Sequence, residues 1–135
     1  MTQYEDCIVF LLAKAYQKAH ADIKKRLRAY GLTPVQHLIL EALWEEEGLS
    51  ATDIGKRLVL DSATLSGVLD RMAEGGWIVK EIDAQDNRFI RIYLSSKANE
   101  MKPVLNEQRK RANEEILSRL TFEEKVLLKR LLRDL

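Results

Sequence analysis

The residues of this sequence best suited to bind another molecule are small, polar or cationic, and they lie between residues 56 and 88. Near the start of one predicted helix, serine and threonine hydroxyls can donate or accept hydrogen bonds, and small side chains permit close approach. These residues are Ser62, Ala63, Thr64 and Ser66. Such chemistry suits base edges in the DNA major groove, which is wide enough to admit a helix. Lys56 and Arg71 are candidates for contacts with phosphates.

A second candidate group is the pair Asp86 and Arg88, in a polar segment between two apolar runs. The segment predicts a turn joining two strands. An arginine at the tip of such a hairpin suits the minor groove, where a narrow A·T tract attracts positive charge. A carboxylate two residues earlier would hold the guanidinium by a charge-assisted hydrogen bond. The alternative is an ordinary turn ion pair, which contributes little on a surface.

Catalytic and metal-binding chemistry has little support. His20 and His37 are the two histidines, and they lack the spacing of metal ligands, so helix-face positions are the simpler interpretation. The sequence has no glycine-rich phosphate loop and no nucleophile–base pair. We therefore expect no enzyme activity, no metal and no cofactor. One cysteine, no membrane-length apolar run and no opening signal peptide favour a cytoplasmic protein.

Residues 50–95 supply the elements that must position these side chains. Ser50 and Asp53 predict a capped helix, and Asp61 predicts the cap of a second. The second helix carries an apolar stripe at i, i+3, i+4 and i+7, and Gly75-Gly76 ends it. The stripe consists of Leu65, Val68, Leu69 and Met72. Two strands, WIVKEI and FIRIYL, follow. Helix, turn, helix and hairpin make a winged helix-turn-helix, although a helix pair with a hairpin is also a common way simply to pack a small core.

Long helices are predicted on both sides of this segment. One covers residues 4–30, and another starts at the Thr33-Pro34 cap. After the hairpin, a helix runs from Ser96 to about Leu120, with a kink at Pro103, and a last helix follows Thr121. The terminal helices are too apolar for the middle domain to bury alone, so a symmetric homodimer is expected, with a monomeric bundle as the alternative. A twofold dimer would present two recognition helices about one DNA turn apart, matching a palindrome.

Net charge argues against nucleic acid. It is +1 for the chain, and residues 50–100 contain seven Lys and Arg against eight Asp and Glu, a net −1. A DNA-binding protein normally neutralises phosphates. The objection weakens if acids serve as caps or arginine partners and the cations gather on one side. Those cations are Lys56, Arg57, Arg71, Arg88 and Arg91.

The stretch LDSATLSGVLDRMAEGGWI, followed by DAQDNR, resembles the MarR family of bacterial transcription regulators. The matching residues are Asp61, Ser62, Thr64 and Leu65, then Asp86 and Arg88. The resemblance implies a mainly α fold with a small β-hairpin wing. It also implies an N-terminal dimerisation helix (1–31), a DNA-binding domain (32–95) and C-terminal dimerisation helices (96–135). Asn87 stands where many relatives have a further arginine, which removes a charge from the wing.

The same resemblance implies a sequence-specific regulator of double-stranded DNA, usually a homodimeric repressor that a small ligand releases from a palindromic operator. Many relatives bind small aromatic acids beside the winged domain, and Tyr16, His20 and His37 are candidates to line such a pocket. Thr64 has an alternative place inside the helix packing. A second hypothesis is a winged-helix protein-interaction module that does not bind DNA. The sequence leaves open the operator, the inducer, and whether the effect is repression or activation.

Cys7 raises a third hypothesis, because one branch of the family senses organic peroxides with a cysteine in its first helix. Cys7 lies about one turn too early, and Pro34, Val35 and His37 occupy the place of the helper tyrosine. The adjacent acids would oppose formation of a thiolate. We expect a surface or interface cysteine, with a redox-responsive regulator as the alternative.

Overall fold

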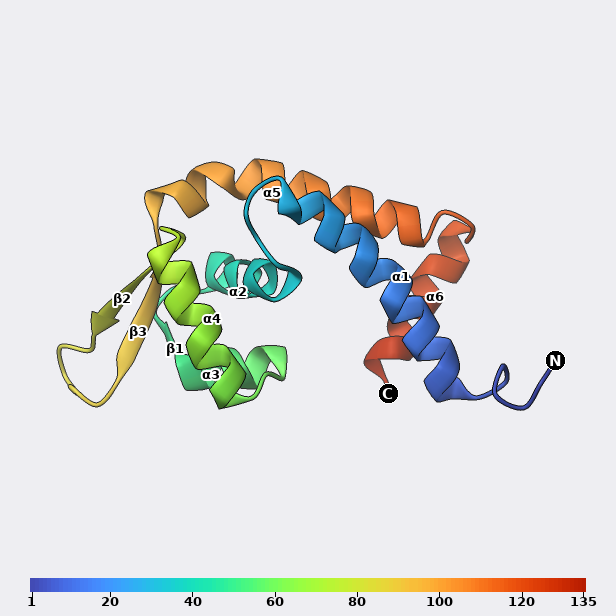
Figure 1. Cartoon of the computed structure of the whole chain (residues 1–135), viewed down its shortest axis with the longest axis horizontal. Coiled ribbons are helices and arrows are strands. Elements are labelled where there is room, and N and C mark those ends of the chain that lie inside the picture. Colours follow the sequence, from blue (N-terminus) through green and yellow to red (C-terminus); the bar gives the residue numbers. More distant parts are fainter. The chain divides into compact units, whose positions relative to one another are not determined.

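A computed structural model describes the whole chain, residues 1–135. Six helices and the β-hairpin follow one another as the sequence predicted, so the mainly helical winged helix-turn-helix is confirmed (Figure 1). In chain order the elements are α1 (Ile8–Arg28), α2 (Pro34–Glu45), β1 (Leu49–Ser50), α3 (Ala51–Leu58), α4 (Ser62–Glu74), β2 (Ile78–Ile82), β3 (Ile90–Leu94), α5 (Ser96–Ile116) and α6 (Phe122–Arg133).

The predicted boundaries need correction at the long helices. The first helix starts at Ile8 rather than residue 4, because residues 3–6 form a turn in which Cys7 N donates to Tyr4 O. The helix after the wing ends at Ile116 rather than near Leu120, because residues 117–119 turn the chain toward the Thr121 cap of α6. Helix α5 continues through Pro103. None of the helices is both long enough and apolar enough to cross a membrane.

The chain divides into two compact units, which we call the terminal unit (residues 1–26 and 106–135) and the winged unit (residues 27–105). These limits differ from the expected boundaries after residues 31 and 95. The reason is that the end of α1 and the first half of α5 carry side chains that belong with the winged unit and are buried. They are Leu27, Ala98 and Leu105.

The winged unit holds nearly all of the buried apolar residues. Helix α4 buries the stripe that the sequence predicted, and Trp77 and Ile78 are buried just after it. The side chains with almost no exposed surface come from every helix of the unit and from the central strand. They are Leu27, Ile39, Leu40, Leu43, Ile54, Leu65, Met72, Ile92 and Leu105.

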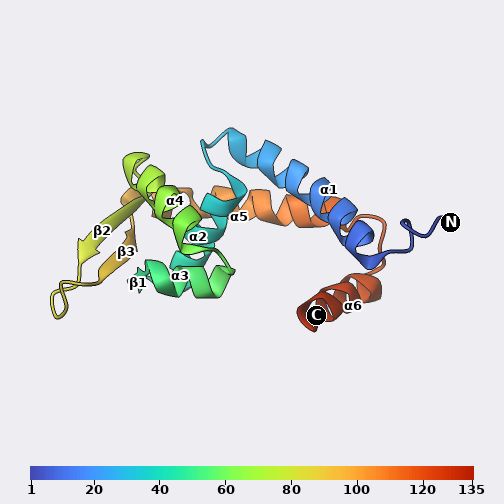
Figure 2. The same cartoon turned by 60° about the horizontal axis from the view of Figure 1, so that its bottom comes forward.

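The sheet has the strand order β1-β3-β2, with both neighbouring pairs antiparallel. Strands β2 and β3 pair from Ile78↔Leu94 to Ile82↔Ile90, and the loop of residues 83–89 joins them. Figure 2 shows this hairpin extending beyond the helices of the winged unit. Strand β1 was not predicted, because two residues are too short to show an alternating pattern. It pairs Leu49 with Ile92 and Ser50 with Arg91.

Candidate nucleic-acid interface

A side-chain cap fixes the start of each of the two helices of the helix-turn-helix, α3 and α4. Ser50 and Asp53 form the predicted capping box at α3, with both N–H to oxygen distances at 3.1 Å. Asp61 caps α4 and accepts from Thr64 N at 2.8 Å. These caps satisfy donors that the first helical turn leaves unpaired, so the N-terminus of α4 has one defined direction.

The outer face of α4 is small, polar and open. Ser62, Ala63, Thr64 and Ser66 are exposed on this helix, so the alternative of a Thr64 buried in the helix packing is wrong. The Thr64 hydroxyl donates to Asp61 Oδ2 at 2.9 Å. Its proton is therefore engaged, and the hydroxyl can offer a partner only its lone pairs.

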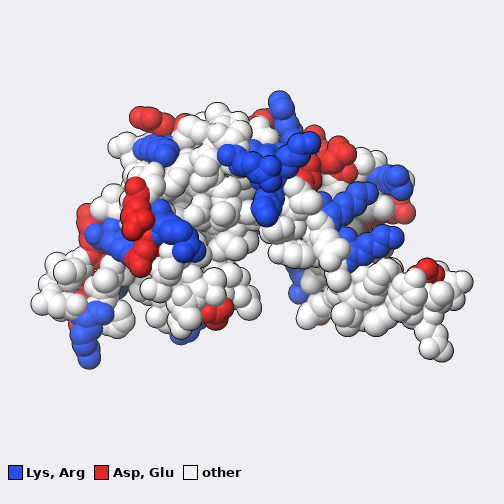
Figure 3. All heavy atoms as spheres, in the orientation of Figure 1, with Lys and Arg blue, Asp and Glu red and all other residues white.

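Carboxylates pair with many of the cations of the winged unit. Glu46 pairs with Arg57, Asp70 with Lys80, Asp86 with Arg88 and Asp83 with Arg91. Lys56 and Arg71 are exposed and form no ion pair. At the left of the view, over the wing and the helix-turn-helix, Figure 3 accordingly shows acidic and basic side chains next to one another rather than one continuous basic patch. The winged unit has nine Lys and Arg against twelve Asp and Glu, a net −3, whereas the terminal unit has thirteen against nine, a net +4.

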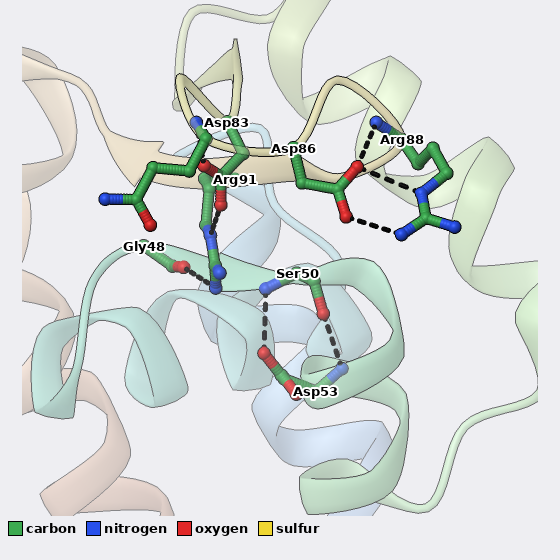
Figure 4. Close-up of polar contacts among 8 residues, drawn as sticks. Gly48, Ser50, Asp53, Asp83, Asp86, Arg88 and Arg91 are labelled. Atoms are coloured by element: carbon green, nitrogen blue, oxygen red, sulfur yellow. Dashed lines mark hydrogen bonds and ion pairs between the residues drawn. The ribbon is translucent and has the colours of Figure 1, made fainter.

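At the wing tip, Asp86 holds Arg88 through three hydrogen bonds (Figure 4). Asp86 accepts from the Arg88 backbone N at 3.0 Å, from Nε at 3.0 Å and from Nη2 at 2.9 Å. These bonds lower the pKa of Asp86 and raise that of Arg88. The Arg88 side chain is 85% exposed, so its guanidinium is oriented by a neighbour yet open to a partner.

Sequence reasoning missed a groove of about 400 Å³ between α3, α4 and the hairpin. Its floor is apolar, and its polar lining combines two lysines with serines of the recognition helix. Lys80 lines this groove but was not among the candidate residues from the sequence. Side chains alternate along a strand, so the pattern of β2 could have placed Lys80 on the same face as Ile78 and Ile82. The lining includes Lys56, Leu60, Ser62, Leu65, Ser66, Leu69, Lys80, Ile90 and Ile92.

The candidate ligand residues fall into both units. Tyr16 and His20 lie on α1 in the terminal unit, with ring centroids 5.3 Å apart. His37 lies in α2 in the winged unit, where it is 3% exposed and its Nε2 is 3.1 Å from Glu41 Oε1. Tyr16 and His20 are therefore the only two of these candidates that lie together within one unit. Cys7 is exposed, just before α1.

Acid should weaken the cap of α4. Hydrogen bonds from the Thr64 backbone and side chain lower the pKa of Asp61 below 3.8, so the ionised carboxylate stabilises the fold above that pH. This stabilisation should disappear as the pH falls through the lowered pKa. Asp61→Asn keeps an acceptor at the cap but cannot titrate. The urea midpoints of wild type and Asp61→Asn should therefore differ at pH 7 and converge below pH 3.8. A gap that stays constant with pH would contradict this account.

Comparison with known proteins agrees with this geometry. A MarR family model matches residues 32–90. Over 94 residues the chain is 39% identical to the HTH-type transcriptional regulator TtmR of Methylorubrum extorquens, covering 70% of this chain and 47% of that protein. Over 91 residues it is 34% identical to the organic hydroperoxide resistance transcriptional regulator of Bacillus subtilis, covering 67% and 62%. The chain thus spans about half of the length of the first relative and less than two thirds of the length of the second.

The likeness extends to a solved structure. The crystal structure of a probable transcriptional regulator from Pseudomonas aeruginosa superposes with a TM-score of 0.91 at 28% identity, covering 96% of this chain and 97% of that one. The capped helices, strand β2 and the Asp86–Arg88 pair all lie in the part of the chain that the family model matches. The chain belongs to the MarR family.

Proposed function

We propose that this protein is a sequence-specific, double-stranded DNA-binding transcription regulator that acts as a homodimer. The observation that carries the proposal is the capped, sterically open face of α4, beside a wing tip that presents an oriented arginine. Helix α4 enters the major groove, and Arg88 enters the adjacent minor groove. Lys56 and Arg71 bind phosphates, because no carboxylate neutralises them.

The exposed apolar surface of the terminal unit supports the homodimer. Ala112 is its single buried apolar residue, and α6 has none. A helix that leaves its leucines in water gains stability by covering them with an equivalent surface. The exposed large apolar residues of this unit are Met1, Tyr4, Ile8, Val9, Leu11, Leu12, Tyr16, Phe122, Val126, Leu127, Leu128, Leu131, Leu132 and Leu135.

The regulator is a cytoplasmic repressor that leaves a palindromic operator when a small aromatic ligand binds. Tyr16, His20 and His37 are its candidate ligand residues. Family membership supports this cycle of binding and release.

One observation favours a second function. The net charge of −3 in the winged unit would weaken attraction to phosphates and suits a winged-helix module that binds another protein. Titrating the protein with a labelled duplex from its own upstream region, at several salt concentrations, separates the two. A regulator should bind this duplex far more tightly than a scrambled one, and its affinity should fall as salt rises. Equal, weak binding to both duplexes would favour the interaction module.

Loss of one base contact should affect one operator position. If Ser66 touches a base edge, Ser66→Ala should cost on the order of 1 kcal/mol there and relax discrimination among bases at that position. The salt slope should stay the same, because no charge is lost. Titrations against single-substitution operators measure both quantities, and Ser118→Ala in the terminal unit is the matched control. A uniform loss across all operators would contradict a base contact.

A further inference from the structure

The side chain of Arg91 bridges the loop of the wing to the segment just before β1, which we call the body end of the bridge. From the second position of β3, its Nε donates to Asp83 Oδ2 at 3.0 Å, and its Nη1 donates to Gly48 O at 3.2 Å (Figure 4). Asp83 opens the wing loop, whereas Gly48 precedes β1, forty-three residues earlier in the chain than Arg91. One rigid guanidinium thus joins two segments that the sequence separates.

At the wing end, Asp83 organises the loop that carries Arg88. Its Oδ1 accepts from Gln85 N at 2.8 Å, and its backbone N donates to Phe89 O at 2.9 Å. The backbone N–H of Gln85 and the guanidinium of Arg91 both lower the pKa of Asp83, so this carboxylate is ionised at neutral pH. Two residues separate Asp83 from Asp86, which holds Arg88. A shift of Asp83 therefore reaches Arg88 through a very short segment.

At the body end, Gly48 is itself fixed. Its φ of +79° favours glycine, and its N donates to Ile92 O at 2.9 Å. The neighbouring Glu47 accepts from Leu94 N at 2.8 Å, and Ser50 begins the capping box of α3. The acceptor that Arg91 uses thus belongs to the segment that leads directly into the helix-turn-helix.

We propose that Arg91 is a positioning residue, which sets the angle between the wing and the helix-turn-helix and so places Arg88 in the minor groove. The proposal rests on the proposed function as a DNA-binding regulator. The guanidinium of Arg91 is held from two separate segments, by Asp83 and by Gly48 O, whereas that of Arg88 is held by Asp86 alone. The Arg91 side chain is 39% exposed against 85% for Arg88. Arg91 therefore acts through Arg88 rather than by touching DNA.

A double-mutant cycle on one operator duplex tests this role. Arg91→Ala should weaken binding about three- to tenfold for each half-site in the wild-type background, because a misplaced Arg88 loses most or all of its contact. In an Arg88→Ala background, Arg91→Ala should change neither the affinity nor the salt slope. Arg91→Lys is the charge-matched control, and one ammonium cannot reproduce the planar fork, so it should behave like Arg91→Ala.

Some results would overturn the proposal. If Arg91 bound a phosphate itself, its removal would cost as much without Arg88 as with it, would lower the salt slope by about 0.9 per wing, and would be rescued by lysine. A second measurement needs no DNA, namely backbone NMR order parameters for residues 83–89 in the free protein. They should fall in both Arg91 variants, while those of α4 stay constant.

The two measurements separate this proposal from the proposed function. If wild type bound no operator while the Arg91 variants loosened the wing, the DNA-binding function would fail and the bridge would stand. A wing that is equally rigid in wild type, Arg91→Ala and Arg91→Lys would overturn the bridge, whatever the protein binds.

Discussion

Replacing Leu127 and Leu131 by aspartate should convert the protein from a dimer of twice 15.6 kDa into a 15.6 kDa monomer. The two leucines lie one turn apart on α6, and each is 48% exposed within the chain. A dimer interface would bury them, and two carboxylates there would lose their water without gaining partners. In the isolated chain the same positions face solvent, so the monomer should keep its fold.

The loss of the dimer should also abolish operator binding. Joining two DNA-binding units makes the second half-site contact intramolecular, which raises the overall affinity by about 10²–10⁴. Light scattering at micromolar concentration measures the mass, circular dichroism checks the helices, and titration with a two-half-site duplex measures the affinity.

The matched control is Lys129→Gln with Arg133→Gln. These residues lie on the opposite face of α6, and the pair changes the charge by the same two units. This variant should remain dimeric. If the aspartate variant also stayed dimeric and bound the operator normally, the interface would not involve α6, and the argument from its exposed leucines would fail.

Local signals explain why so much of the winged unit could be predicted. The Thr33–Gln36, Ser50–Asp53 and Thr121–Glu124 capping boxes each depend on residues three apart, and all three form. The apolar stripe of α4 depends on one helical period, and all four of its residues are buried. Such patterns decide structure within a few residues, so a single sequence reveals them.

The missed features depend on residues that are distant in sequence. Arg57 pairs with Glu46 across eleven positions, Lys80 with Asp70 across ten, and Arg91 reaches Gly48 across forty-three. No local period encodes these contacts, because the fold must form first. The same holds for the unit boundaries, since the burial of Leu27 and Leu105 reflects tertiary packing rather than the start or end of a helix.

In the candidate site, too, some features could be predicted from neighbouring residues and others could not. The Asp86–Arg88 pair spans two residues and was predicted, whereas the hydrogen bond from the Thr64 hydroxyl to Asp61 was not. The sequence suggested that acids could neutralise the basic residues, but only the structure reveals which cations they leave free. That distinction makes Lys56 and Arg71 stronger phosphate candidates than Arg57.

Arg88→Ala should weaken binding to every duplex by about tenfold for each half-site, and therefore by about a hundredfold for a dimer on a palindrome. The side chain reads the shape of the groove rather than a base edge, so part of the A·T preference beneath the wing should also disappear. One phosphate-adjacent charge is lost from each wing, which should lower the salt slope by about one unit per wing. Titrations at several salt concentrations, with A·T and G·C duplexes, measure all three effects.

Asp86→Ala is the variant that separates orientation from charge. It leaves the positive charge in place but removes all three hydrogen bonds that hold Arg88, so the guanidinium becomes free to rotate. We expect part of the loss seen with Arg88→Ala, because ordering a flexible side chain on binding costs entropy. Tighter binding by Asp86→Ala would instead mean that the carboxylate merely repels phosphate. In that case the Asp86–Arg88 pair would be an ordinary turn ion pair, and the wing would bind through charge without a fixed direction.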